Sequence, residues 1–332
     1  MLQLGIGLRG QSKLKEIIEY SRLAEQLSLH FIWVPDVDLE RETFVTAACI
    51  ALSTEKIGIG VISNPYTRHP AISAAAVATL NEIAEGRVRY ALCAGGFKSL
   101  KPFGFASWEK PLSSIRKAVE LSKSLFRGES VLPKGAEEGA TLKLAFQSRH
   151  RIPIYIAAMT GKKMMELAGR VADGVLLAGP LGFEFTKSCI DHVIEGAIKA
   201  GRSAKEITIA MEALFSVSYD SCKAKEEAKS LVGEMIIADP RFTAALKAAD
   251  IAEYEVELVK RSLSKSKEEI VKAVNERMVD QFSISGSPNQ CVEKIRTYAE
   301  IGIQEICLLP PTDSNIKQLL NIIGKDILPS LQ

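Results

Sequence analysis

Short apolar runs alternate with amphipathic helical patterns along this chain of 332 residues, and this alternation constrains the fold more than any other feature. It is typical of β-α-β units, in which parallel strands are covered by their crossover helices. Eight apolar runs can be counted as strands, each followed by a helical segment. The count favours a closed barrel over an open doubly wound sheet. The sequence therefore predicts an α/β fold, a (β/α)8 TIM barrel, as a single domain over residues 1–332.

The predicted strands share short lengths and many aliphatic or β-branched residues. They cover residues 2–8, 31–34, 57–61, 88–93, 154–157, 174–177, 207–211 and 305–309. Two segments interrupt the rhythm. Residues 127–150 are polar and irregular, and residues 221–277 are rich in Ala, Lys and Glu and too long for an ordinary crossover helix. We expect the second segment to be a helical insertion, bounded by residues 213–283, between strands seven and eight.

The first strand carries Gly5-x-Gly7-x-x-Gly10, which matches the dinucleotide-binding fingerprint, and Asp36 ends the next strand. In that fingerprint the helix begins inside the motif and receives a pyrophosphate at its N-terminus. Here the helix is expected to begin only after Gly10, with Ser12 as its N-cap. We therefore interpret the glycines as a tight loop above the first strand.

Composition limits the partners of the protein. The 42 Lys and Arg residues nearly balance the 40 Asp and Glu residues, which does not favour nucleic acid or a membrane surface as the main partner. The N-terminus lacks the pattern of a signal peptide, so we expect a cytoplasmic protein. The six cysteines are widely spaced and are expected to be buried free thiols, and with only four histidines we expect no metal site.

The most unusual segment is Gly60-Val61-Ile62-Ser63-Asn64-Pro65-Tyr66, where a strand runs into a polar loop that ends at Pro70. In a TIM barrel such a loop lies at the active-site face. The alternative is a rigid strand-to-helix turn without a ligand, in which Asn64-Pro65 only shapes the chain.

This segment resembles the G-V-x-N-P-Y segment of coenzyme F420-dependent methylenetetrahydromethanopterin reductases, which belong to the luciferase-like superfamily. The likeness continues in blocks that keep family order and spacing over nearly the whole chain. These blocks are Leu80-Asn81-Glu82-Ile83, Trp108-Glu109-Lys110-Pro111-Leu112, Ile152-Pro153-Ile154-Tyr155-Ile156-Ala157-Ala158, Ala172-Asp173-Gly174-Val175-Leu176, Asp280-Gln281-Phe282-Ser283-Ile284-Ser285-Gly286 and Ile322-Ile323-Gly324-Lys325-Asp326-Ile327-Leu328-Pro329.

The resemblance implies a coenzyme site with a non-proline cis peptide within Gly60 to Ile62 as a backstop for the deazaflavin ring. Asp36 matches an acid of the family and is expected to be both a catalytic and a coenzyme-binding residue. The other residues expected at the coenzyme are Gly60, Val61, Ile62, Ser63, Asn64, Cys93, Ala94, Gly95, Ala157, Ala158, Met159, Thr160, Gly161 and Lys162. Lys162 begins a helix where positive charge and backbone amides suit a phosphate, although a solvated helix start is the alternative.

Three polar positions of the family are missing. Gly7 stands in place of a glutamate on the first strand, Val37 in place of a histidine, and Gly96 in place of an acid. A positioned carboxylic acid can contribute a hundredfold or more to a rate. Glu212, after strand seven, is the candidate replacement acid, and a surface glutamate is the alternative.

The resemblance thus implies an F420-dependent oxidoreductase that transfers a hydride between the deazaflavin and a pterin-type or other small substrate, in one-carbon metabolism. An FMN-dependent luciferase-like monooxygenase and a non-catalytic barrel relative are the alternatives. By the same resemblance we expect a homo-oligomer, a homodimer or larger.

Overall fold

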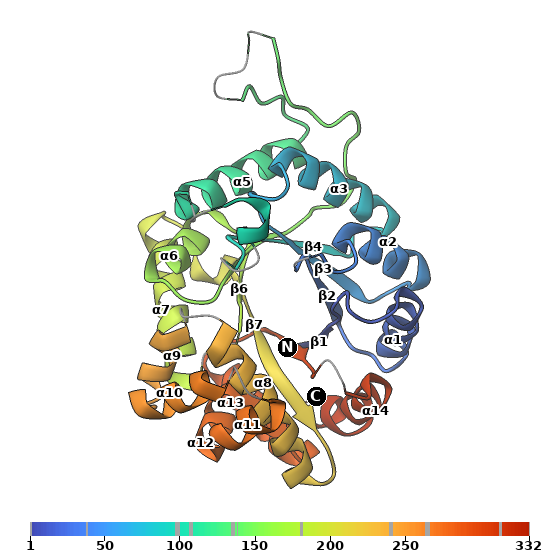
Figure 1. Ribbon diagram of the computed structural model, residues 1–332. Coiled ribbons are helices and arrows are strands. Elements are labelled where there is room, and N and C mark those ends of the chain that lie inside the picture. The colour runs from blue at the N-terminus through green and yellow to red at the C-terminus, as the bar shows by residue number, and fades with distance from the viewer. Residues whose placement is uncertain are drawn as a thin grey trace.

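Parallel strands form a closed barrel in the computed structural model, with helices around its outside (Figure 1). The structure describes residues 2–37, 39–96, 100–105, 109–133, 137, 139–179, 182–238, 242–262, 266–311 and 314–331. The strands of this part of the chain are β1 (Gln3–Gly7), β2 (Phe31–Pro35), β3 (Gly58–Ser63), β4 (Val88–Cys93), β5 (Ile154–Ala158), β6 (Gly174–Leu177), β7 (Thr208–Val217), β8 (Ser283–Gly286) and β9 (Glu305–Leu309).

The barrel contains β1 to β7 and β9. Neighbours in sequence pair from β1 to β7, β7 pairs with β9, and β9 pairs with β1 to close the ring. The closed eight-stranded barrel predicted from the sequence is therefore confirmed. The predicted eighth strand, residues 305–309, is β9.

The remaining strand, β8, is not part of the ring. It pairs with the second half of β7, from Leu214 to Val217, whereas β9 pairs with Ala210 to Leu214. The expected insertion boundary at residue 213 differs from this structure, because residues 213–217 continue β7 as a run of buried residues. The prediction also missed β8, whose four residues Ser-Ile-Ser-Gly carry too little apolar pattern to stand out.

Most helices connect consecutive strands of the barrel, and the others follow β7 and β9. They are α1 (Leu14–Gln26), α2 (Thr43–Ser53), α3 (Pro70–Ile83), α5 (Pro111–Phe126), α6 (Lys162–Val171), α7 (Phe183–Lys199), α8 (Ser221–Ala238), α9 (Thr243–Ala248), α10 (Glu253–Ser262), α11 (Lys267–Ala273), α12 (Glu276–Phe282), α13 (Pro288–Glu300), α14 (Ile316–Ile322) and α15 (Leu328–Leu331), with short 3-10 turns η1 (Lys101–Phe103) and η2 (Ala204–Glu206) and a π-helical turn η4 (Ile323–Ile327).

Hydrogen bonds at the N-cap mark the starts of α13 and α1, and the predicted N-cap of α1 is wrong by one residue. Ser287 caps α13, and the side chain of Gln290 accepts a hydrogen bond from the Ser287 backbone N–H at 2.8 Å. The N-cap of α1 is Lys13 rather than the predicted Ser12. Glu16 decides this position, because its carboxylate accepts the Lys13 backbone N–H at 3.0 Å.

Glycines make room for aromatic rings inside the barrel. Phe31 of β2 lies in register with Gly5 of β1 and Gly58 of β3, and Trp33 lies in register with Gly7 and Gly60. A Cβ atom added to Gly60 would lie 2.2 Å from the Trp33 ring. The bulk of β2 therefore requires the absence of side chains on both neighbouring strands.

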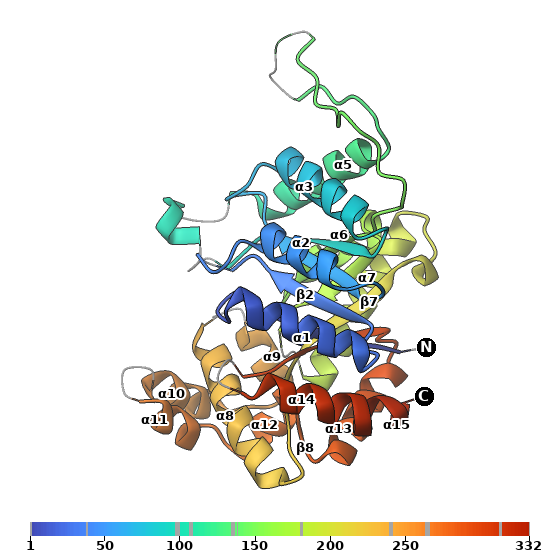
Figure 2. The ribbon, with the colours of Figure 1, turned by 90° about the vertical axis from the view of Figure 1, so that its right-hand side faces the viewer.

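The helices between β7 and β8 have an apolar cluster of their own, which includes Phe242, Val259 and Phe282. In Figure 2, α10 and α11 extend beyond the barrel on the same side as η1, whereas both chain termini lie on the opposite side. Because η1 follows β4, this side is the carboxyl end of the strands, and the insertion helices stand beside it.

Candidate active site at the carboxyl ends of the strands

Most residues that the sequence predicted as functional lie together at one end of the barrel. They follow or end parallel strands, and the carboxyl ends of parallel strands meet at one face of a TIM barrel. We call this face the mouth, defined by Asp36 after β2, Ile62 at the end of β3, Cys93 ending β4, Ala157 of β5 and Glu212 of β7. The structure brings these five positions to the same face, although they are far apart in sequence.

Alternate residues of β3 have different surroundings. Ile62 belongs to the apolar cluster inside the barrel, and Gly60 contacts Trp33 there. Val61 packs into the core between strands and helices, and the Ser63 hydroxyl hydrogen-bonds to the Tyr90 hydroxyl at 2.9 Å. The side chains of Val61 and Ser63 therefore point away from the mouth, which leaves Gly60 and Ile62 as the residues of this strand that face it.

The expected cis peptide within Gly60 to Ile62 is wrong, since the structure has none in the described part of the chain. The strand explains why. Each residue from Gly58 to Ile62 has a partner on β2, and Ile59 to Ser63 have partners on β4. A trans backbone keeps both regular ladders.

Asn64 shapes the loop after β3. Its side-chain oxygen accepts hydrogen bonds from the backbone N–H groups of Tyr66 and Thr67 at 3.0 and 2.9 Å, and from the Thr67 hydroxyl at 3.1 Å. These contacts form a local turn around Asn64-Pro65. The Tyr66 hydroxyl then donates to the Glu109 carbonyl at 3.1 Å, which ties this loop to the start of α5.

Asp36 is half-buried at the mouth, and burial raises the pKa of its carboxyl above the ordinary value. Arg68 opposes this shift of the Asp36 pKa, and Glu42 adds to it. Arg68 is itself paired with Glu42 at 2.5 Å and lies over the Phe44 ring. A carboxyl with a raised pKa at the active-site face of a barrel is a candidate to contact a ligand.

Glu212 lies across the mouth on β7. Burial raises the pKa of its carboxyl to about 7, and a hydrogen bond from the Gly179 backbone N–H works against that shift. The Cys307 thiol on the neighbouring β9 is fully buried beside it. A carboxyl with a pKa near 7 exchanges its proton within the physiological range, which is the property required of a general acid.

Two loops between these acids are formed by small residues. Gly95, after Cys93 and Ala94, and Gly161, after Met159 and Thr160, have positive φ values of 72° and 110°. A Cβ atom added at Gly161 would meet no other atom within 4 Å. Within β5, Ala157 faces the interior cluster, whereas Ala158 faces the helices. The backbone at Gly161 is therefore open to a ligand, whereas Gly95 lies against the Leu100 side chain.

Lys162 lies beside the mouth but is already paired. Its ammonium group is 3.5 Å from Glu195 and 3.9 Å from Glu166, and about half of the side chain is exposed. The geometry thus agrees with the alternative of a solvated helix start as well as with a phosphate ligand.

The glycine loop after β1, which resembles a dinucleotide fingerprint, is bonded to the loop after β2. Arg41 donates to the Gly10 carbonyl at 2.7 Å, and Arg9 pairs with Glu40 at 2.6 Å. A Cβ atom added to Gly10 would lie 2.7 Å from the Arg41 nitrogen. Helix α1 begins only at Leu14, so its N-terminus lies outside the glycine motif.

Two residues at the base of the mouth, Trp33 and Leu309, were not predicted from the sequence. A Cβ atom added to Gly7 would lie 2.4 Å from Leu309, and the Trp33 indole N–H is buried without a hydrogen-bond partner. For Trp33, glycines at alternate positions of the first and third strands were the available signal, since they mark a bulky residue on the strand between them; Leu309, on β9, has no such signal.

Within the described residues, no three His, Cys, Asp or Glu side chains gather in a way that could hold a metal ion. No helix in that same part of the chain is both long enough and apolar enough to cross a membrane.

Comparison with known proteins agrees with this geometry. The family model described as luciferase-like monooxygenase matches residues 2–305. The 5,10-methylenetetrahydromethanopterin reductase of Methanolobus tindarius is 32% identical over 98% of this chain and 100% of its own length, and that of Archaeoglobus fulgidus is 32% identical over the full length of both.

Among solved structures, the coenzyme F420-dependent tetrahydromethanopterin reductase of Methanopyrus kandleri superposes with a TM-score of 0.91 and 26% identity, covering 100% of this chain and 99% of that one. The barrel, the residues gathered at its mouth and these matches lead to one assignment: the chain belongs to the luciferase-like family of oxidoreductases, on the branch of the methylenetetrahydromethanopterin reductases.

Proposed function

We propose that this protein is a coenzyme F420-dependent oxidoreductase that transfers a hydride between the deazaflavin and a pterin-type or similar small substrate, with Glu212 as its proton donor. The observation that carries the proposal is the Glu212 carboxyl, whose pKa of about 7 places a proton at the mouth of a barrel that is similar over its full length to F420-dependent reductases.

The residues of the mouth suit a flat ring with an anionic side chain. Ile62 and Ala157 belong to the apolar cluster that faces the mouth, and the loop at Gly161 exposes backbone next to it. The coenzyme, when bound, supplies the hydride chemistry. The protein supplies orientation, exclusion of water and the proton.

Glu212 takes the role that a strand-one glutamate has in the resemblance described above. A side chain at Gly7 would have to displace the end of the Leu309 side chain, which occupies the adjacent space. A carboxyl on β7 can instead face a substrate nitrogen from the other side of the mouth. Asp36, whose pKa is also raised, would hold the polar edge of the ligand.

Two measurements test the proposal. Titration with F420 and with FMN should show binding of F420, and micromolar binding of FMN without binding of F420 would instead support the monooxygenase alternative. Glu212→Gln should lower kcat about 100-fold, whereas Glu206→Gln, at an exposed position before β7, should not.

The non-catalytic alternative has its own test. Gly7→Glu combined with Leu309→Ala restores an acid on β1 and removes the side chain that would collide with it. Activity that appears only in this double variant would show that the natural chain is silenced.

The same proposal includes a cytoplasmic location, a role in one-carbon metabolism, and one barrel domain with an inserted helical segment. It also includes a homo-oligomer, most simply a homodimer. Val45 and Leu52 of α2 and Ile72 of α3 are 60, 77 and 59% exposed on two helices that pack together, and exposed apolar surface of this kind supports a subunit contact. Light scattering on Leu52→Asp should show a smaller species than the natural chain.

A further inference from the structure

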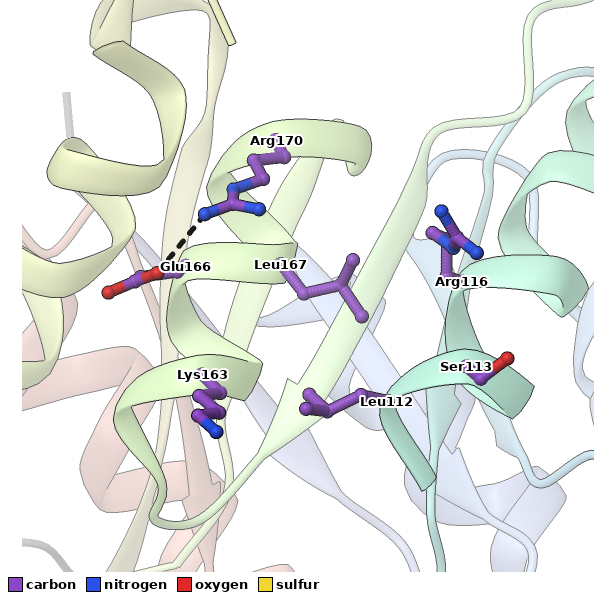
Figure 3. Close-up of a pocket in the computed structure, with 7 residues that line it drawn as sticks. All are labelled: Leu112, Ser113, Arg116, Lys163, Glu166, Leu167 and Arg170. Carbon is purple, nitrogen blue, oxygen red and sulfur yellow. Dashed lines mark hydrogen bonds and ion pairs between the residues drawn. The ribbon is translucent and has the colours of Figure 1, made fainter. Parts of the chain in front are cut away.

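An open groove with a volume of about 430 Å³ lies between α5 and α6 on the outer side of the barrel (Figure 3). Leu112 of α5 and Leu167 of α6 point toward each other across it. Leu167 is largely buried, and the two helices pack together along this side. The base of the groove is therefore apolar and held between two regular helices.

Cationic side chains border the groove. Arg116 comes from α5, and Lys163 and Arg170 come from α6. Arg116 has only a distant partner, Glu120 at 3.9 Å, and in the part of the chain that the structure describes no ion pair involves Lys163. Two cations are thus available to a ligand.

The acidic side chain of the lining, Glu166, is already neutralised. Its carboxylate lies 3.2 Å from Arg170, 3.5 Å from Lys199 and 3.9 Å from Lys162. Figure 3 shows the Glu166 contact with Arg170. The groove therefore keeps a net positive charge.

The cations are spread along the groove. Lys163 and Arg170 are seven residues apart on one helix, which corresponds to roughly 10 Å at 1.5 Å per residue. Arg116 faces them from the other helix. A single small anion contacts only one such position, whereas a chain with several anionic groups can contact both Arg116 and Lys163.

The groove begins next to the mouth. Leu112, Ser113 and Lys163 lie in the first turns of their helices. The segments before those helices come from the carboxyl ends of β4 and β5 and include Gly95 and Gly161.

From these contacts we propose that the groove binds an extended polyanion, a flexible chain that carries two or more carboxylate or phosphate groups. Two sources have this chemistry: the charged side chain of the coenzyme at the mouth, and a free polycarboxylate. The first source rests on the proposed function, and the second does not.

The test uses Arg116→Glu/Lys163→Glu, with Lys117→Glu/Lys187→Glu as a control that makes the same charge change at exposed positions outside the groove. Matching thermal unfolding of the two variants establishes that both fold. Calorimetric titrations then use F420, the same deazaflavin without its phosphate and glutamate groups, and a triglutamate peptide.

If the side chain of the coenzyme occupies the groove, the groove variant binds F420 about 10-fold more weakly than the control, because each lost surface pair costs a few-fold in affinity. The truncated deazaflavin binds both equally, and saturating F420 blocks triglutamate. If a free polycarboxylate occupies the groove, triglutamate binding weakens by the same factor and persists with F420 present.

Equal binding of F420 and of triglutamate by the two variants, or no binding of either ligand, overturns the proposal. The proposed function fails separately, when neither F420 nor the truncated deazaflavin binds the natural chain. The triglutamate titration still decides the groove in that case.

Discussion

The two ends of the barrel interior differ in whether their buried charged side chains have ion-pair partners. At the amino ends of the strands, which we call the floor, Arg89 donates to Glu305 at 3.2 Å and to the Gln3 side chain at 2.9 Å, and lies over the Phe31 ring. The Tyr155 hydroxyl completes the network with contacts of 3.4 Å to Glu305. Both charges of this network, Arg89 and Glu305, therefore have partners.

At the mouth, Asp36 and Glu212 are only partly exposed, no ion pair of either carboxylate occurs among the described residues, and burial raises both pKa values. The comparison teaches that burial alone does not identify function. A buried charge with a full set of partners holds the barrel together, and a buried acid that keeps its proton is available for chemistry.

The largest effect is expected at the floor. Arg89→Met leaves the Glu305 carboxylate buried without its cation and should lower the free energy of unfolding by about 4 kcal/mol. Denaturant unfolding measures this loss. The double variant Arg89→Met/Glu305→Leu removes both charges and should recover most of it. A single variant as stable as the natural chain would mean that the network has no structural role.

At the mouth, removal of the Glu212 charge is expected to raise stability, whereas removal of the Arg89 charge at the floor lowers it. The effect at Glu212 depends on pH. The folded pKa of Glu212 is raised from 4.5 to about 7, so the folded protein binds this proton more tightly than the unfolded chain does. The natural chain should lose about 3 kcal/mol relative to Glu212→Gln as pH rises from 4.5 to 7, with no further change above 7.

Unfolding of both proteins at several pH values measures this difference, with Glu206→Gln as the control. A constant difference between the natural chain and Glu212→Gln across this range would show that the Glu212 pKa is ordinary and would remove the contrast with the floor.

Between the two ends lies Trp33, for which Gly60 of β3 makes room. Gly60→Ala places a methyl group against the rigid Trp33 ring and should cost about 2 kcal/mol of unfolding free energy. Combining it with Trp33→Leu should give a smaller loss than the sum of the single losses. Additive losses would mean that the two residues do not share this space.

The smallest effect is expected at Lys162, beside the mouth but paired with Glu195 and Glu166. Lys162→Ala should change stability by less than about 1 kcal/mol and F420 affinity by less than about threefold. Its neighbour Lys163, which borders the groove, is the matched comparison. A larger loss of affinity at Lys162 than at Lys163 would make Lys162 the phosphate ligand.

The sequence by itself determined the barrel. Parallel strands buried on both sides read as apolar runs and crossover helices read as amphipathic patterns, so both periods are local signals. It also indicated the mouth, because the carboxyl ends of barrel strands share one face whatever their side chains.

Tertiary structure decided which of the mouth residues face a ligand and what their charges do. Within Gly60 to Ser63, pleating turns Val61 and Ser63 away, and the ladders to β2 and β4 keep the backbone trans. The pKa of Glu212 depends on its burial in the folded barrel and on the Gly179 backbone N–H in the loop after β6, which is remote in sequence. The periodicity of the sequence predicts which residues are buried. Only the packing of the folded chain decides which neighbours surround each buried residue, and the energies of desolvation and charge pairing depend on those neighbours.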